Sequence, residues 1–133
     1  MDETIREAIC QDLAHSRDEL EAARILHREH KDRQALSRAY YAVFYAATAV
    51  LESKRIRRAK HSGVKSAFGQ FFVKDKTIES EYSDIYVRVR ESRELRDYER
   101  GYVPAADFAS EKIDEAEKFV ARMEKYLRDA GAI

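Results

Sequence analysis

The chain has 133 residues, of which 44% are hydrophobic and 38% charged, and its 25 basic and 25 acidic side chains give a formal net charge of zero. This balance excludes a global electrostatic attraction to nucleic acid or membrane, so any such binding must come from a local patch. Four glycines, one proline and one cysteine, Cys10, provide little material for the turns of a sheet protein and no pair for a disulfide or a cysteine zinc site. An all-α domain is the class that these features favour.

Two long helices are predicted in the first half of the chain. Residues 4–29 carry apolar side chains at helical spacing, and the polar segment 30–33 predicts a tight connection to the next helix. That second helix contains residues 37–51, SRAYYAVFYAATAVL, whose apolar side chains occupy nearly every angle of a helical wheel. A helix that is apolar nearly all round must be buried nearly all round. We therefore expect the other helices to pack around residues 37–51.

Two further helices are expected in the middle of the chain. Residues 62–73 have apolar side chains on one helical face, with Ser62 as the predicted N-cap. Thr77 is the predicted N-cap of a fourth helix, and the next position on the apolar stripe of that helix is Arg93. The stripe itself consists of Ile78, Tyr82, Ile85 and Val89.

The last predicted helix follows Gly101, a candidate terminator, and Pro104, which a first helical turn tolerates. Its apolar residues alternate at spacings of four and three, which predicts packing along another helix of this chain or of a second copy. They are Ala109, Ile113, Ala116, Val120, Met123 and Leu127. No linker or repeat interrupts the chain, so we expect one domain, residues 1–133, built as an up-and-down bundle of four to five helices.

The segment RELRDY, residues 93–98, is the strongest candidate for chemistry. An arginine on an apolar stripe needs a partner, a ligand or a cleft, because a buried unpaired charge costs several kcal/mol. Asp97 lies one helical turn after Arg93 and can orient it, while the Tyr98 phenol can donate or accept a hydrogen bond. These three residues are the catalytic candidates. The alternative is a salt bridge at a helix end beside a core tyrosine.

A second candidate is the basic segment KRIRRAKH, residues 54–61, which contains no acidic side chain. Such a cluster can hold a phosphate backbone, or it can be a solvated turn. His61 can line the same cleft as Arg93, or it can make a structural hydrogen bond at a helix start. The nucleic-acid-binding candidates are Lys54, Arg55, Arg57, Arg58, Lys60, His61, Arg90 and Arg96.

The sequence shows no strong signal for a metal site, a membrane-spanning segment or a signal peptide. His27 and His30 are three residues apart, but no third ligand is evident, so we expect neither a metal site nor a cofactor. No run approaches the roughly 20 apolar residues that span a bilayer. The acidic start MDETIREAI lacks the apolar run of a signal peptide, and cysteine usage is typical of a reducing compartment. A cytoplasmic protein that does not bind membranes is expected.

Three motifs in order resemble the HEPN domain family over about residues 22–127: SRAYYAVFYAATAVL, then KHSGV, then an arginine shortly before Asp-Tyr. The resemblance implies a HEPN-like bundle that forms a homodimer with a cleft for RNA or nucleotide at its interface. It also implies a partner nucleotidyltransferase in a toxin-antitoxin pair, and metal-independent endoribonuclease activity in toxin members.

Arg93 matches the catalytic arginine of that family, but the histidine expected four to six residues later is missing, and no histidine follows Arg93 at all. A histidine moves protons near neutral pH, whereas an unperturbed tyrosine is a poor base there. In some such pairs the partner attaches adenylate to a tyrosine near the motif, which makes Tyr98 and Tyr102 the candidate acceptors. The alternative to an enzyme is a non-catalytic nucleotide-binding or protein-interaction module.

Overall fold

The structure is a computed structural model that describes residues 1–98, 101 and 103–133, with the side chains of residues 95–98 left undescribed. Its order is α1 (Glu3–Arg28), α2 (Asp32–Ser53), α3 (His61–Phe68), the π-helix η1 (Gly69–Val73), α4 (Glu81–Tyr98) and α5 (Ala106–Asp129). No strand occurs among these residues, so the predicted all-α class is confirmed.

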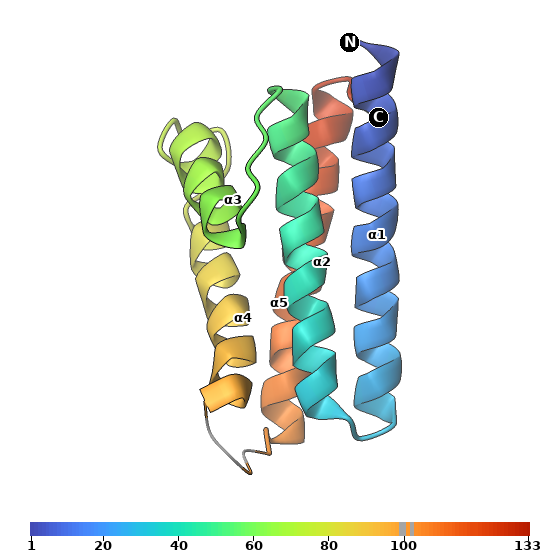
Figure 1. The fold of residues 1–133 in the computed structure, drawn as a ribbon, viewed down its shortest axis with the longest axis vertical. Coiled ribbons are helices and arrows are strands. Elements are labelled where there is room, and N and C mark those ends of the chain that lie inside the picture. Colours follow the sequence, from blue (N-terminus) through green and yellow to red (C-terminus); the bar gives the residue numbers. More distant parts are fainter. Residues whose placement is uncertain (99–100, 102) are drawn as a thin grey trace.

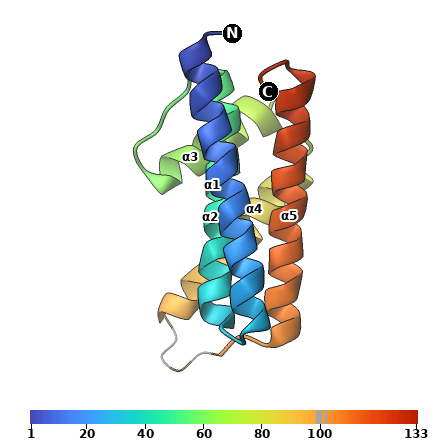
Figure 2. The same cartoon turned by 90° about the vertical axis from the view of Figure 1, so that its right-hand side faces the viewer.

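The four long helices run alternately down and up, and α2 lies among the others, in contact with α1, α3, α4 and α5 (Figure 1). Turning the molecule shows α5 beside α1, with both chain termini at the same end of the bundle (Figure 2). The short α3 lies at the upper end of α4 in this view (Figure 1). The predicted up-and-down bundle is therefore correct.

Helix α1 begins where its sequence can satisfy free backbone amides. The Asp2 carboxylate accepts a hydrogen bond from the Thr4 amide at 2.7 Å, and an acidic N-cap also suits the positive end of the helix dipole. The helix ends before His30, whose positive φ of 61° turns the chain toward α2. A buried hydrogen bond of 2.7 Å from the Ser16 hydroxyl to the Ala42 carbonyl ties α1 to α2.

Helix α2 is buried on most of its circumference, as predicted, with Ala39, Val43, Ala46 and Val50 fully enclosed. One strip of it is only half-buried. This strip, which we call the open face of α2, consists of Tyr41, Phe44, Tyr45 and Thr48. Three aromatic side chains are therefore in partial contact with solvent along the central helix.

The middle of the chain departs from prediction at two helix starts. Helix α3 begins at His61 with Lys60 at its N-cap, so Ser62 does not cap it, and a π-helix replaces its predicted second half. Helix α4 begins at Glu81 rather than after Thr77, whose amide donates to the Asp75 carboxylate at 3.0 Å. At Thr77, a loop hydrogen bond forms in place of the predicted cap, whereas α3 starts one residue before Ser62 without a side-chain cap.

Helix α5 packs inside its own chain. Its predicted apolar residues are all at most 1% exposed and belong, with Phe119, to the core formed with the other helices. Pro104 precedes the helix, which begins at Ala106, and Gly101 has φ of 80°, a conformation that glycine adopts without strain. The periodic stripe of α5 is therefore explained by the bundle, without a second copy.

Candidate functional site

Arg93 lies on the face of α4 that packs against α2, as its place on the apolar stripe predicts. Its guanidinium carbon is 5.1 Å from the centre of the Tyr40 ring and 5.3 Å from that of Tyr41. Two aromatic rings thus hold the cation in place by cation–π attraction. The Nε atom is buried and has no hydrogen-bond partner among the described residues. The arginine is fixed in position but not fully satisfied.

A cavity of about 220 Å³ opens beside Arg93, and we call it the Arg93 pocket. A second guanidinium, that of Arg38, contributes to it, lying 5.0 Å from the Tyr41 ring and 2.8 Å from a Glu19 oxygen. The Ser37 hydroxyl is also buried and lacks a partner among the described residues. The full lining is Gln34, Ser37, Arg38, Tyr41 and Arg93.

The Arg93 pocket can hold an oxyanion. Two cations, a hydroxyl and an amide provide donors from several directions, and guanidinium groups match the geometry of phosphate oxygens. The one carboxylate known to contact these cations, Glu19, is bonded to Arg38 and not to Arg93. Among the described residues, Arg93 therefore has no carboxylate partner.

His61 is brought to the same tyrosine pair from the start of α3. Its Nδ1 atom is 3.2 Å from the Tyr40 hydroxyl oxygen, and its ring centre is 4.3 Å from that of Phe44 and 5.8 Å from that of Tyr41. Burial raises the pKa of the Tyr40 phenol, and Arg93 opposes this effect only in part. Tyr40 is therefore a neutral hydrogen-bonding group. Its bond to His61 agrees with the structural interpretation of that histidine, which is not among the residues that line the Arg93 pocket.

Few contacts are described for the residues that follow Arg93 in the RELRDY segment. Asp97 and Tyr98 lie in the last turn of α4, together with Arg96, and their side chains are outside the described residues. Tyr102 is also outside them. Their proposed roles in catalysis, RNA binding and modification stay predictions.

The basic segment 54–61 divides into residues engaged in the fold and residues open to solvent. The Lys54 ammonium donates to the Phe71 carbonyl at 2.8 Å and lies 4.3 Å from the Phe72 ring centre. The Arg57 guanidinium donates to both carboxylate oxygens of buried Glu52. Lys54 and Arg57 thus have structural partners, whereas the side chains exposed without an acidic partner among the described residues are Arg55, Arg58 and Lys60.

Arg90 lies one turn before Arg93 on α4 but does not line the Arg93 pocket. Its Nε atom is 3.6 Å from a Glu94 oxygen, too long for a hydrogen bond, and is buried without a partner among the described residues. Arg90 is close enough to Tyr40 to act on its pKa in the same direction as Arg93. Its positive charge therefore acts on Tyr40 from the same helix as Arg93.

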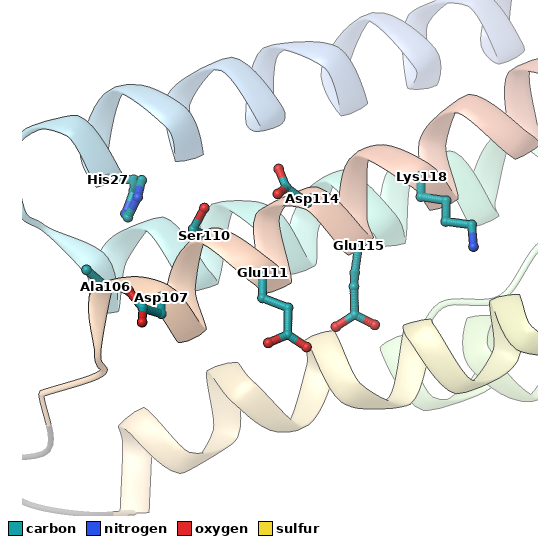
Figure 3. Close-up of a pocket in the computed structure, with 8 residues that line it drawn as sticks. All are labelled: His27, Ala106, Asp107, Ser110, Glu111, Asp114, Glu115 and Lys118. Atoms are coloured by element: carbon teal, nitrogen blue, oxygen red, sulfur yellow. The ribbon is translucent and has the colours of Figure 1, made fainter.

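A larger cavity than the Arg93 pocket, about 700 Å³, lies along α5 (Figure 3). Glu111 and Glu115 point from α5 toward α4, whereas Asp114 points toward α1 (Figure 3). Glu115 is bonded to Lys112 at 2.6 Å and to Arg88 at 2.5 Å. This acidic hollow repels phosphate, so its size does not make it the site of the predicted chemistry.

A third cavity, about 290 Å³, lies between α1, α2 and the segment that follows α2. Asp12 and Glu52 both line it. Burial, and then the nearby Glu52 carboxylate, raise the pKa of Asp12 to about 6. Glu52 has Arg57 as its partner, whereas Asp12 makes no hydrogen bond or ion pair among the described residues. At neutral pH, its surroundings therefore disfavour the charged form of the Asp12 carboxylate.

Four lining residues of the Arg93 pocket were not predicted from sequence as site residues: Gln34, Ser37, Arg38 and Tyr41. The signal was present in their spacing, because Gln34, Arg38 and Tyr41 recur at helical intervals and so share one face of α2. That face of α2 belongs to a site only because α4 places Arg93 opposite it, which the sequence does not show. Among the residues whose positions are given, no three potential metal ligands cluster, and His27 instead contacts Asp32 at 2.7 Å.

Comparison with known proteins provides the family. A model described as HEPN domain matches residues 13–127 of the chain. A protein of Methanocaldococcus jannaschii named "Putative toxin MJ0605" is 36% identical over 129 residues, which cover 97% of this chain and 96% of the relative. A "UPF0332 protein" of Thermotoga maritima is 33% identical, with 86% of each chain covered. A second M. jannaschii protein, "Putative toxin MJ0142", is 30% identical over 81% of this chain and 74% of its own length.

No helix in the described ranges has the length and apolar character to cross a membrane.

Proposed function

The chain belongs to the HEPN domain family, and from this premise we propose that it is a toxin-like protein whose Arg93 pocket binds a phosphate group of RNA or of a nucleotide. The support for a toxin-like role is the name of two relatives, each matched over most of its length. We further propose that the protein acts in a pair with a nucleotidyltransferase, as the resemblance in its sequence motifs implies.

The proposal that the Arg93 pocket binds a phosphate group rests on one observation. Arg93 lies against two tyrosine rings and lines a small cavity, and its buried Nε has no acceptor among the described residues. A buried donor without an acceptor costs about 1–3 kcal/mol, and a bound oxyanion removes that cost. Ser37 is in the same condition, so one ligand satisfies two groups. Arg38 provides a second positive charge.

We propose RNA rather than an isolated anion because exposed Arg55, Arg58 and Lys60, between the end of α2 and His61, could provide further contacts for a phosphate chain. Asp97 and Tyr98 follow Arg93 on α4, and we assign to Asp97 the orientation of the arginine and to Tyr98 either an acid role or the attachment of adenylate, with Tyr102 as the other acceptor. A second copy packed on the open face of α2 would place the pocket at a dimer interface.

Binding of a short fluorescent single-stranded RNA, measured by anisotropy, tests the proposal. Arg93→Gln should weaken binding about tenfold or more, because hydrogen bonds to charged groups contribute about 1.5–3 kcal/mol and 1.4 kcal/mol is tenfold. Arg88→Gln is the matched control. Arg88 is an exposed arginine of the same helix that bonds to Glu115 instead of facing the pocket, so its loss should change affinity less than twofold. Equal effects of the two substitutions would contradict the assignment.

A second candidate function is a non-catalytic interaction module. It is favoured by one observation, the absence of any histidine after Arg93 in the sequence. Its expected signature is a stable complex with the partner nucleotidyltransferase in size-exclusion chromatography, combined with nucleotide binding and no RNA turnover. Mass spectrometry of the protein incubated with that partner and ATP would show a gain of one AMP on Tyr98 or Tyr102 if modification occurs.

A further inference from the structure

The first turn of α2 has no side-chain cap. Lys31 occupies the N-cap position, and its carbonyl accepts the first helical hydrogen bond, from the Ala35 amide at 2.9 Å. The backbone amides of residues 32–34 therefore have no acceptor among the described residues. They lie at the positive end of the dipole of a 22-residue helix, where N–H groups point out of the helix and can bind an anion.

A cavity of about 280 Å³ lies at this end of α2. Lys31 and Arg33 line it and are exposed. The one carboxylate among its described lining residues, that of Asp32, contacts the His27 Nδ1 atom at 2.7 Å. The Lys31 amide donates to the Leu26 carbonyl at 2.8 Å, which fixes the turn before the helix. The cavity is therefore a positively charged hollow with a fixed backbone.

This cavity and the Arg93 pocket share a wall. Gln34 lines both, and Ser37, one helical turn further along α2, lines the Arg93 pocket. One turn of helix is about 5 Å long, so groups bound in the two cavities would be neighbours. The turn before α2 and the end of α4 also lie at the same end of the bundle (Figure 1). Ser37 is only 7% exposed and its hydroxyl has no partner among the described residues, a condition that a bound ligand relieves.

The two cavities together carry more positive charge than one phosphate can balance. Their lining includes four cationic side chains: Lys31, Arg33, Arg38 and Arg93. Glu19 pairs with Arg38, which leaves three of the four without an acidic partner among the described residues. A single phosphate group carries at most about two negative charges at neutral pH. The charge therefore fits a ligand with more than one phosphate.

We propose that the N-terminal end of α2 is a second anion subsite beside the Arg93 pocket, and that the ligand carries two phosphate groups in a row. The first phosphate binds at Arg93, and the second binds the amides of residues 32–34 together with Lys31 and Arg33. This inference rests on the proposed function, because it needs a phosphate in the Arg93 pocket. A nucleoside diphosphate and two successive phosphates of an RNA strand both provide this chemistry.

Isothermal titration calorimetry of the full chain with AMP and with ADP, without divalent cations, tests the second subsite. ADP should bind about tenfold or more tightly than AMP, because its second phosphate accepts further hydrogen bonds from charged groups. Inorganic pyrophosphate should exceed inorganic phosphate by a similar factor.

Lys31→Asp blocks the second subsite. An aspartate at the N-cap accepts a hydrogen bond from the first-turn amides and repels a phosphate there. The variant should lower ADP affinity about tenfold or more, change AMP affinity less than threefold, and raise Tm, which shows that it folds. Arg33→Gln should also weaken ADP binding, without a new negative charge. Lys74→Asp is the matched control, because Lys74 is an exposed lysine that lines neither cavity, and it should change each affinity less than twofold.

A short single-stranded RNA, measured by anisotropy, distinguishes the two sources of paired phosphates. A preference for ADP with RNA affinity unchanged in Lys31→Asp would assign the subsite to a free nucleotide, whereas a tenfold loss of RNA affinity in that variant would assign it to the RNA backbone. Equal affinities for AMP and ADP, together with no effect of Lys31→Asp on RNA, would overturn the second subsite while Arg93-dependent binding persists. Binding of AMP and RNA that does not depend on Arg93 would instead overturn the proposed function.

Discussion

Replacing Asp12 by asparagine should stabilise the protein at neutral pH. The carboxylate is half-buried beside Glu52 and has no cationic partner of its own among the described residues. Burial raises the pKa of Asp12 from an ordinary 3.8 to about 6, so at pH 7.5 the folded state holds a charge that the unfolded state solvates better. Asparagine has nearly the same shape and no charge to desolvate.

The magnitude follows from linkage between protonation and folding. A pKa raised from 3.8 to about 6 corresponds to about 3 kcal/mol at 1.36 kcal/mol for each pH unit. Because the side chain is only partly buried, solvent screening reduces this to about 1 kcal/mol. In a domain of this size, 1 kcal/mol is a rise in Tm of about 3–4 °C.

The stabilisation by Asp12→Asn should depend on pH. A group whose folded-state pKa is raised contributes stability below the unfolded-state pKa and loses it as pH rises through the folded-state value, here between about 4 and 6. The stabilisation by Asp12→Asn should therefore be about 1 kcal/mol at pH 7.5 and a few tenths at pH 4.5.

The assay is urea unfolding followed by circular dichroism, with Asp18→Asn as the control, because Asp18 is an exposed aspartate of the same helix. That control should change the free energy of unfolding by less than about 0.5 kcal/mol. A destabilised Asp12→Asn at pH 7.5, or a difference from wild type that is the same at both pH values, would refute the reasoning.

Two further substitutions separate structural from functional contacts. Tyr40→Phe removes the hydroxyl that is hydrogen-bonded to the His61 Nδ1 atom, so the free energy of unfolding in urea should fall by about 1 kcal/mol, while RNA affinity, measured by anisotropy, should stay within about twofold. An unchanged free energy of unfolding would mean that this hydrogen bond does not stabilise the fold. Lys54→Met removes a donor to the Phe71 carbonyl, so the free energy of unfolding should fall by about 1 kcal/mol in urea, and RNA affinity should change less than on Arg55→Gln. A larger loss of affinity for Lys54→Met would show that the ammonium leaves its structural partner to bind RNA.

Elements with long apolar periodicity were predicted correctly, because a helix that must bury a wide face has few alternatives. The 37–51 segment is the centre of the bundle, and the stripe of α5 from Ala109 to Leu127 is buried as its spacing indicates. The predicted helix starts at Ser62 and Thr77 were wrong, because capping depends on a single side-chain hydrogen bond that a loop can replace. The π-helix at 69–73 has no signal of its own in the apolar pattern.

The candidate site was predicted only in part. Arg93 was predicted as a site residue because its charge interrupts an apolar stripe, and this feature is visible in the sequence alone. The structural roles of Lys54 and Arg57 were not found, because their partners Phe71 and Glu52 become neighbours only when the segment after α2 folds back. The same holds for Ser37 and Arg38, which belong to the pocket only through the position of α4.

The sequence by itself determined the all-α class, the central helix, the family resemblance and the arginine at which chemistry is expected, because these depend on periodicity and residue type within single segments. The tertiary structure decided what surrounds that arginine. It left one strip of α2 half-buried, placed Tyr40 and Tyr41 under Arg93, and brought His61 from another helix to the same rings. The physical reason is that apolar burial fixes which faces of helices meet, whereas the polar groups at those faces become partners only after the helices have packed.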